Sequence, residues 1–399
     1  MRSTTAADHG AWTDAPTIPG VEPLTAGLER EWDELARASD ASPFLRPAYL
    51  RLWRASFDAD GRPPDVVVAR REGRLAGALP VSRDGGRVGP PGNFETPAGG
   101  IVAGDPVAAA VVARGLLEWG ARRVDFHHIP AAGASRQAIE RAAVIGGHRV
   151  VRRVTMRSPV ADTVGGWEAY WGARSRNLRH NVERCRRRAR EAGELTFDVH
   201  HAFAPGELAR LLEEGFAVEG SGWKTAQGTA ILTSPRTRRY YTDLAGWAAD
   251  EGWLRLSFLR IDGRPIAFCL GVEAFGVHDA LKMGYDVAVA RLSPGMMLLD
   301  ALIRRAFETG LTRFDFAGHD EQYKLAWATG TEDQVSLSVF PPTPGGRLAY
   351  RTERTRIALA ESPLRPFLRP AAVALRGAAA RVRPRRGPHE DSAAGRETP

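Results

Sequence analysis

The sequence predicts an α/β protein with a mixed β-sheet, in which one half-fold is built twice. The first observation is a pair of hairpin patterns. Apolar runs at 65–70 and 74–81 are joined around Glu72-Gly73, and runs at 253–261 and 265–272 are joined at Asp262-Gly263. A short turn containing glycine between two such runs is typical of a β-hairpin. Gly73 and Gly263 stand 190 positions apart in the chain.

The second observation is a helix–glycine–strand passage that repeats at the same offset. EWGARRVDF begins at Glu118, and ETGLTRFDF begins at Glu308. Each string predicts a helix that ends at a glycine C-cap and a strand that follows. Two separate matches at one ungapped offset favour duplication over coincidence. The identical pairs are Glu118/Glu308, Gly120/Gly310, Arg123/Arg313, Asp125/Asp315 and Phe126/Phe316.

Between these repeated passages the second half carries additional predicted elements. Helices are expected over 172–192, 205–219, 235–250 and 296–309, and a strand over 278–286. The first helix has apolar residues at helical spacing with arginines elsewhere, and two others begin with proline at the first helical position. The apolar positions of the 172–192 helix are Leu178, Val182, Cys185 and Ala189.

The domain organisation follows from these patterns. Residues 1–20 are small, polar and rich in Pro and Gly, and are expected to be disordered. Residues 21–155 are interpreted as an N-terminal domain and 156–345 as a C-terminal domain. Residues 346–399 are interpreted as a helical, Arg-rich and partly disordered tail. In this tail apolar residues interleave with arginine, so contact with a membrane surface is an alternative to disorder.

Composition excludes several classes of protein. The 399 residues are 43% hydrophobic and 26% charged, which is ordinary for a globular protein. No apolar run reaches the ~18–20 residues that span a bilayer, and no signal-type segment begins the chain. Cys185 and Cys269 lack partners at metal spacing, and the histidines form no metal pattern. We therefore expect a cytoplasmic protein without a metal.

The basic residues are almost all arginine. Of 55 Lys plus Arg, only Lys224, Lys282 and Lys324 are lysine, and all three lie in one part of the chain. Lysine is a compact charge that can lose its proton, whereas arginine cannot. The surviving lysines are therefore candidate functional residues.

A turn before the 296–309 helix is a candidate phosphate site. A helix N-terminus presents free N–H groups and the positive end of the helix dipole. Ser293 is expected to be the N-cap, Pro294 the first helical residue, and Gly295 a point of close approach, with Arg291 adding charge. An ordinary capped helix start has the same pattern, and the sequence leaves both readings open.

The segment DFAGHDEQYK, from Asp315, is a second candidate. Asp315 repeats Asp125 of the first half, which favours a structural role, such as a salt bridge to the matching arginine. Tyr323 and Lys324 have no counterpart in the first half. Function is therefore more readily assigned to these unshared residues.

The Arg-rich helix over 172–192 and the loop after residue 219 form a third candidate. The helix is either a solvated basic face or a surface for an anionic partner, such as cofactor phosphates, a polyanionic glycan or RNA. The loop reads EGSGWKTAQG and contains Glu219, Trp223 and Lys224. Its tryptophan either packs on the core or stacks on a sugar or base.

Taken in order, these segments resemble a known family. GARSRNLRHNVERCRRRAREAG, EGSGWK, LKMGYD, RLSPGMMLLDALI and FDFAGHDEQYKLAW look like the CelD/BcsL-like acetyltransferases of the GNAT superfamily, which are relatives of the FemAB peptidyltransferases. The resemblance covers about residues 25–345. It implies two tandem GNAT-like domains and transfer of an acyl group from acyl-CoA to an amine or hydroxyl.

The resemblance also implies roles for particular residues. The donor pyrophosphate would lie on the turn at 291–296, and Tyr323 would protonate the leaving thiolate. The candidate catalytic residues are Tyr323, Lys324, Lys282 and Glu219. The candidate donor-binding residues are Arg291, Ser293, Pro294, Gly295 and Met296, and the candidate acceptor-binding residues are Trp223, Lys224, Tyr285 and Asp286.

The turn departs from the usual GNAT pattern Arg/Gln-x-x-Gly-x-Gly/Ala, because it has the single glycine Gly295. Three hypotheses therefore stand. The first is an acyl-CoA-dependent transferase acting on a polysaccharide or cell-envelope precursor or a small metabolite. The second is a FemAB-like transferase that takes its acyl group from aminoacyl-tRNA. The third is a non-catalytic protein that binds a glycan or nucleic acid.

Overall fold

The computed structural model describes residues 17–58, 63–221 and 230–361. Their strands form a mixed sheet whose order is β1-β2-β3-β4-β6-β13-β7-β12-β11-β10-β9-β8, and β5 pairs with β3. The strands of the first half are β1 (Thr17–Pro23), β2 (Asp65–Arg71), β3 (Arg74–Asp84), β4 (Arg87–Gly89), β5 (Val102–Ala103), β6 (Arg123–Pro130) and β7 (Arg149–Asp162). Those of the second half are β8 (Leu195–His200), β9 (Leu254–Ile261), β10 (Arg264–Ala274), β11 (Val277–Tyr285), β12 (Arg313–Asp315) and β13 (Gly330–Phe340).

The strand order confirms the predicted duplication. Read from its two ends, the sheet runs β1-β2-β3-β4-β6 on one side and β8-β9-β10-β11-β12 on the other. Both hairpin turns have two consecutive residues with positive φ: Glu72 and Gly73 at 51° and 78°, and Asp262 and Gly263 at 49° and 76°. A two-residue turn of this kind matches the twist of the flanking strands.

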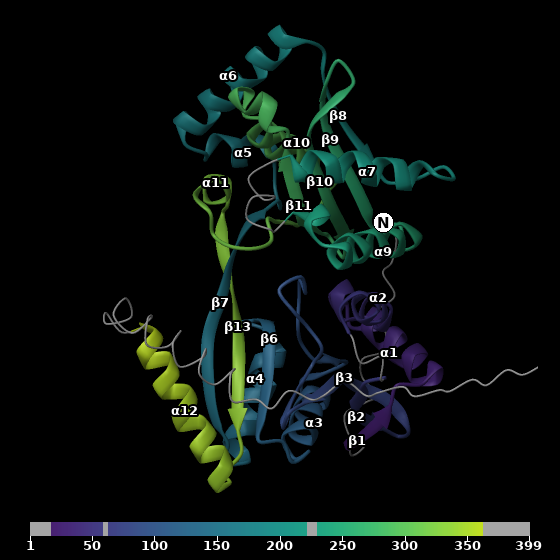
Figure 1. Cartoon of the computed structure of the whole chain (residues 1–399), viewed down its shortest axis with the longest axis vertical. Helices are drawn as coiled ribbons and strands as arrows, with labels where there is room; N and C mark the ends of the chain where they lie inside the picture. Colours follow the sequence, from purple (N-terminus) through teal and green to yellow (C-terminus); the bar gives the residue numbers. More distant parts are fainter. Residues whose placement is uncertain (1–16, 59–62, 222–229, 362–399) are drawn as a thin grey trace, which may run out of the picture.

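The two halves exchange their last strands. β7 comes from the first half and pairs with β12 of the second, whereas β13 comes from the second half and pairs with β6 of the first. β7 and β13 pair with each other along most of their length and connect the two stacked halves (Figure 1). The predicted domain boundary between residues 155 and 156 falls inside β7, and the division into domains stays a prediction.

Helices cover both faces of each half of the sheet. In the first half, α3 (Pro106–Leu117) and α4 (Ala134–Ile145) cover one face, and α1 (Ala26–Ala38) covers the other. In the second half, α5 (Trp167–Gly172), α6 (Arg176–Ala192) and α10 (Pro294–Glu308) share one apolar cluster. On the opposite face, α7 (Glu207–Gly220), η3 (Ile231–Thr233) and α9 (Pro235–Asp250) pack together with η2 (Pro43–Leu45) and α2 (Pro47–Phe57) of the first half. The remaining elements are η4 (Val287–Leu292), α11 (Gln322–Leu325) and α12 (Pro344–Glu361).

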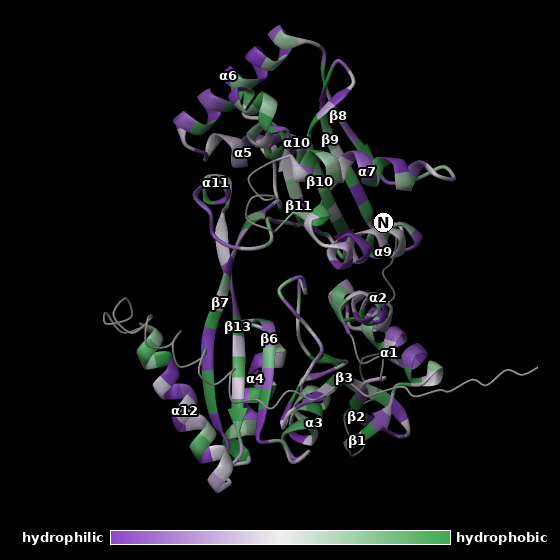
Figure 2. Ribbon diagram, in the orientation of Figure 1, coloured by the Kyte–Doolittle hydropathy of each residue, from purple (hydrophilic) through white to green (hydrophobic). Residues whose placement is uncertain are grey.

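Hydropathy explains why these elements pack as they do. The predicted stripe of α6 is buried: Leu178, Val182, Cys185 and Ala189 all face the sheet. In Figure 2 the strands of the second half are largely hydrophobic, whereas α6 carries much hydrophilic colour. A helix with one apolar stripe and a polar remainder lies on the surface with its stripe toward the core.

The repeated Arg-x-Asp pairs are ion pairs in both halves, as the sequence suggested for Asp315. Arg313 Nη2 lies 2.8 Å from Asp315 Oδ2, and Arg123 Nε lies 2.6 Å from Asp125 Oδ1. Each carboxylate also accepts a hydrogen bond from a serine of the exchanged strand, Ser158 at 2.7 Å for Asp315 and Ser338 at 2.6 Å for Asp125. The shared residues thus form the same ion pair and the same serine hydrogen bond in both halves.

Three local expectations are wrong. Residues 17–20 were expected to be disordered, but they begin β1 because their backbone pairs with β2. The helix expected over 172–192 begins only at Arg176, since the preceding helix α5 ends at Gly172 and Ser175 caps α6. Ser293 occupies the N-cap position of α10 without a side-chain capping bond, because its backbone is left-handed with φ 54° and ψ 53°. Residues 1–16 and the tail beyond residue 361 lie outside the described residues.

Candidate functional site

The strands β11 and β12 form a fork in the second half of the sheet. They pair in parallel only over three residues, with Val277, His278 and Asp279 opposite Arg313, Phe314 and Asp315. Beyond Asp279 and Asp315 the two strands separate. We call this divergence the fork.

A cavity of about 400 Å³ occupies the open end of the fork. Its wall combines apolar side chains with a few polar groups, the composition typical of small-molecule sites. We call it the fork cavity. It is lined by Leu178, Glu219, Met283, Gly284, Tyr285, Ala290, Ser293, Gly295, Met296, Leu299, Tyr323, Ala326 and Trp327.

Six predicted site residues meet in this cavity although they lie far apart in the chain. They are Glu219, Tyr285, Ser293, Gly295, Met296 and Tyr323. Their meeting results from the sheet, because β11 leads to the turn before α10 while β12 leads to α11 on the other arm of the fork. The sequence grouping of these six is therefore also a spatial grouping.

The turn before α10 presents a helix N-terminus to the cavity. Pro294 is the first helical residue, as predicted, and is buried. A Cβ atom at Gly295 would lie 3.4 Å from Tyr285 Cδ1, so glycine keeps this part of the wall open. Ser293 lines the cavity, and its hydroxyl forms no hydrogen bond within the described residues. N–H groups and the dipole at this end of the 15-residue helix favour an anionic group.

Tyr323 stands on α11 at the opposite wall. Its side chain is 52% exposed, so the hydroxyl is accessible to a ligand. Desolvation and the nearby negative charge of Glu321 raise the pKa of Tyr323 well above its usual value. The phenol is therefore protonated at neutral pH and can donate a proton.

Lys324 is placed differently from its neighbour. It is buried, at 8% exposure, and does not line the fork cavity. Its Nζ donates to Ala317 O at 2.6 Å and His319 O at 3.3 Å, and lies 2.8 Å from Glu321 Oε2. These bonds hold the loop that follows β12, in which Ala317 has a left-handed backbone at φ 49°.

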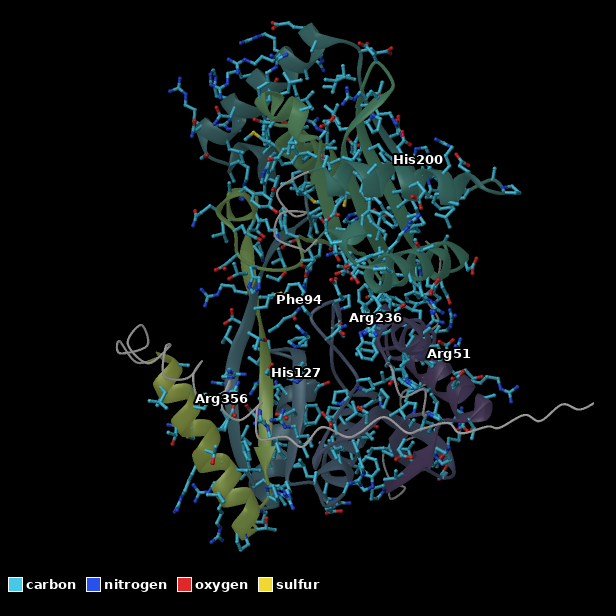
Figure 3. The ribbon with its side chains drawn as sticks, viewed as in Figure 1. Arg51, Phe94, His127, His200, Arg236 and Arg356 are labelled. Carbon is cyan, nitrogen blue, oxygen red and sulfur yellow. The ribbon has the colours of Figure 1, made fainter. Side chains whose placement is uncertain are left out.

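Lys282 also lies outside the cavity wall, although its neighbour Met283 belongs to it. Its Nζ lies 3.5 Å from Glu95 Oε2 and 5.0 Å from the ring centroid of Tyr241. The Tyr241 hydroxyl donates to the same Glu95 oxygen at 2.6 Å. Glu95 belongs to the loop of the first half that carries Phe94 into the space between the halves (Figure 3). Lys282 thus joins the two halves.

Glu219 is a buried carboxylate at the end of α7. Its Oε2 accepts a hydrogen bond from Ile231 N at 3.0 Å. The strand passes close to it, since a Cβ at Gly284 would lie 2.5 Å from Glu219 Cα. Trp223 and Lys224, which follow it in the chain, lie outside the described residues.

Two predicted ligand-binding residues have positions that do not reach the cavity wall. Asp286 caps η4 by accepting from Ala288 N at 2.9 Å and pairs with Arg264 at 2.5 Å. Arg291 is exposed on η4. The structure thus does not bring Arg291, Pro294, Asp286, Lys282 or Lys324 into the lining of the fork cavity.

The Arg-rich helix α6 starts at the cavity, where Leu178 is part of the wall. Nitrogen-tipped side chains project outward along it in Figure 3. Arg186 pairs with Glu183 and Asp300, and Arg187 lies 3.8 Å from Glu191. Five other arginines have no acidic partner within 4 Å among the described residues: Arg176, Arg179, Arg184, Arg188 and Arg190.

Sequence reasoning missed the apolar part of the wall. Leu178 and Leu299 lie on the buried sides of α6 and α10, and neither was among the predicted site residues. Trp327 lies just after α11, and its carbonyl accepts from Tyr170 at 2.5 Å. A helical stripe has the same sequence pattern whether it faces core or ligand, so only the position of the fork separates the two. In the part of the chain that the structure describes, no group of three His, Cys, Asp or Glu could hold a metal.

One family model matches a segment of the second half. Residues 176–325 match the family model of the acetyltransferase (GNAT) domain. This segment begins at the start of α6 and contains every residue of the cavity wall except Ala326 and Trp327. Residues 176–325 are thus similar to a GNAT acetyltransferase domain, as the resemblance to that superfamily implied.

Solved structures that are similar to this chain align with more than four fifths of it. FemX has a TM-score of 0.57 at 11% identity, and the match covers 84% of this chain and 99% of FemX. A conserved protein of unknown function from Bacteroides thetaiotaomicron has a TM-score of 0.52 at 11% identity and covers 81% and 100%. A tandem GNAT protein from the clavulanic acid biosynthesis pathway has a TM-score of 0.42 at 14% identity and covers 82% and 99%.

No curated protein matches the sequence. Among the described residues, no helix has the length and apolar character needed to cross a membrane. The expected cytoplasmic location stays a prediction.

Proposed function

We propose that the chain transfers an acyl group from acyl-CoA to an amine or hydroxyl, and that the fork cavity binds the acyl donor. The observation that carries this proposal is the pairing of an apolar cavity with the N-terminus of α10 at its rim. The donor has the same two parts, an anionic pyrophosphate and an extended arm that ends in a thioester. The pyrophosphate would lie at Ser293–Met296, on the positive end of the helix dipole.

The arm would run along β11, whose outer edge is free of β12 beyond Asp279. Backbone groups at such an edge are available to hydrogen bond an amide. Met283 and Leu299 provide apolar contact on the same side. In this arrangement Tyr323 faces the donor from the other arm of the fork and is the group that protonates the leaving thiolate.

Catalysis of this kind needs no covalent intermediate on the protein. Holding both substrates in a reactive geometry lowers the barrier by removing the entropy of their encounter. Lys324 contributes by fixing the loop that precedes α11, and Lys282 by fixing the first half against β11. The acceptor is proposed to be a polysaccharide or cell-envelope precursor or a small metabolite, from the resemblance to CelD/BcsL-like acetyltransferases.

Binding of acetyl-CoA tests the proposal directly. Isothermal titration of the full chain with acetyl-CoA should give a saturable signal, and Gly295→Val should abolish it because the new side chain meets Tyr285. A matched control is Gly166→Val, since Gly166 has open space around it, an extended backbone with φ −104°, and a position outside the cavity wall. Equal binding by the wild type and Gly295→Val would contradict the donor site.

A second candidate donor is aminoacyl-tRNA, and the five unpartnered arginines of α6 favour it. A surface that neutralises several phosphates binds with a strong salt dependence. Thermal-shift titrations with acetyl-CoA and with tRNA separate the alternatives. A shift by tRNA alone that vanishes at 0.5 M salt would replace acyl-CoA by tRNA as donor or indicate a non-catalytic nucleic-acid binder.

A further inference from the structure

Two carboxylates stand side by side at the closed end of the fork. Asp279 of β11 is the register partner of Asp315 of β12, and this is the last paired position before the strands separate. Side chains of directly paired residues on one face of a sheet are neighbours. The pair therefore sits at the point where the two strands separate, just outside the lining of the fork cavity.

The two carboxylates have opposite surroundings. Asp315 accepts hydrogen bonds from Ser158 Oγ at 2.7 Å, Arg313 Nη2 at 2.8 Å and Ala317 N at 2.8 Å. Asp279 is partly buried, and none of the described residues donates a hydrogen bond or forms an ion pair with it. Asp315 thus has three hydrogen-bond donors, whereas Asp279 has none among the described residues and is left available to a ligand.

The charged groups around Asp279 on each neighbouring element define its electrostatics. On β12 they are Asp315 and Arg313, and Arg313 is shared with Glu332 of β13. On β10 the register partner is the apolar Val272, and on β11 His278 points to the opposite face, where it stacks on Phe314. Glu219 and Lys282 lie farther along toward the open end. Burial raises the pKa of Asp279, the negative charge of Asp315 raises it further, and Arg313 lowers it, with a result of about 7.

The duplication of the half-fold distinguishes Asp279 from Asp315. Asp315 has a counterpart 190 positions earlier, Asp125, with the same arginine and serine contacts. The counterpart of Asp279 at this offset is Gly89, at the end of β4. β4 pairs in parallel with β6 in the first half, as β11 pairs with β12 in the second. A Cβ at Gly89 would lie 2.1 Å from Asp125 O, so the first half has no room for this side chain. The carboxylate pair exists only in the half that carries the fork cavity.

We propose that Asp279, the register partner of Asp315 at the point where the strands separate, is the general base that takes a proton from the acceptor. The inference rests on the proposed acyl transfer. Asp279 lies four residues before Met283, ~13 Å along the strand, so an arm extended along β11 brings its thioester toward the fork.

For an amine acceptor, each proton and each bond in the proposed step is accounted for. Asp279 carboxylate takes one proton from the ammonium group, and the nitrogen lone pair forms the C–N bond as the C–S bond breaks. Tyr323 gives its proton to the departing thiolate and recovers one from the acylated nitrogen. Asp279 then releases its proton to water, so the products are the amide, the free thiol of CoA and one proton.

The first test measures the pH at which the carboxyl group of Asp279 titrates. Carbon-13 NMR of the full chain labelled at aspartate carboxyls, with Asp279→Asn for assignment, should show Asp279 titrating near pH 7. Asp315→Asn should shift that titration to lower pH, because a negative charge is lost and Arg313 is freed. Asp125→Asn is the matched control and should leave it unchanged. Titration of Asp279 near its ordinary pKa of ~3.9 would overturn the inference.

The second test follows thiol release from acetyl-CoA with glucosamine or ethanolamine as acceptor. Asp279→Asn should lower kcat about 100-fold or more without changing the Kd of acetyl-CoA. The acidic limb of the wild-type pH–rate profile should move to lower pH in Asp315→Asn and stay in place in Asp125→Asn. Wild-type kcat in Asp279→Asn would refute the base role alone, whereas no thiol release by the wild type would refute the proposed function and the base role with it.

Discussion

The ammonium group of Lys324 donates to the carbonyl oxygen of Ala317 across 2.6 Å and thereby closes the loop between β12 and α11. The loop contains two consecutive left-handed residues, Ala317 at φ 49° and Gly318 at φ 72°. A non-glycine residue in this region is strained and persists only when its surroundings hold it there. Lys324 provides that restraint next to the residue that faces the cavity.

Replacement of Lys324 by methionine should lower both stability and activity. The substitution leaves the carbonyl groups of Ala317 and His319 without their donor, which costs about 1–3 kcal/mol. Urea unfolding measures this loss. Arg291→Met removes an exposed cation and should cost less than 0.5 kcal/mol. Equal stabilities for the two variants would show that Lys324 does not hold the loop.

Tyr323→Phe should separate activity from stability. The side chain is half-exposed, so loss of its hydroxyl should change the free energy of unfolding by less than about 0.5 kcal/mol. Loss of a proton donor should lower kcat about 100-fold while the Kd of acetyl-CoA stays constant. Tyr350→Phe, on α12 beside Phe340, is the control and should behave as the wild type. An unchanged kcat in Tyr323→Phe would remove the tyrosine from the reaction.

Ser293→Gly should move stability and donor binding in opposite directions. The backbone at this position is left-handed, with φ 54° and ψ 53°, which glycine adopts without strain. Thermal unfolding should show a gain of up to about 1 kcal/mol. Titration calorimetry should show weaker binding of acetyl-CoA, because the hydroxyl at the cavity wall is lost. A gain in stability with unchanged binding would show that the hydroxyl does not contact the donor.

Glu273 should make the fold sensitive to acid. Its carboxylate contacts His278 Nδ1 at 2.9 Å and Arg255 Nε at 2.6 Å, and also pairs with Arg305. Burial alone would raise the pKa of Glu273, but the bonds from His278 and Arg305 outweigh it and lower the pKa from 4.5 to about 2. A lowered folded-state pKa stabilises the protein above pH 4.5, and this contribution disappears as the pH falls through 2.

At neutral pH the contribution is about 3 kcal/mol, at 1.36 kcal/mol per pKa unit. Glu273→Gln should therefore lower the free energy of unfolding at pH 7 by about this amount and flatten its pH dependence between pH 5 and 2. Chemical denaturation at several pH values measures both. Parallel pH curves for the wild type and Glu273→Gln would contradict the assignment.

Much of the fold was predictable because its signals are local. The hairpin turns need two consecutive positive φ angles, and Glu-Gly and Asp-Gly sequences provide them. The C-cap glycines Gly120 and Gly310 have φ of 74° and 72°, as a helix end requires. The strand exchange was not predictable, because β7 and β13 pair over residues that lie about 180 positions apart in the chain.

The predicted site residues also fall into two groups, those that line the fork cavity and those that do not. Of the predicted residues, Ser293, Gly295, Met296 and Tyr323 line the fork cavity. Each was predicted from a local signal, which is a helix start for the first three and the lack of a counterpart in the first half for Tyr323. Lys282 and Lys324 were predicted as site residues because lysine is rare in this chain, but their side chains point to Glu95 and to Ala317 instead of the cavity wall. The direction of a long side chain depends on what surrounds it, and the sequence pattern does not contain that information.

The sequence by itself determined the duplicated α/β fold, the position of the turn before α10, and the distinction between residues that the halves share and those they do not. These follow from periodicity, turn chemistry and the 190-residue offset. Only the tertiary structure decided that Asp279 stands beside Asp315, that six distant residues line one cavity, and that Glu95 of the first half meets β11. Those contacts depend on the register of parallel strands and on the packing of one half against the other, which join segments without any local relation in the chain.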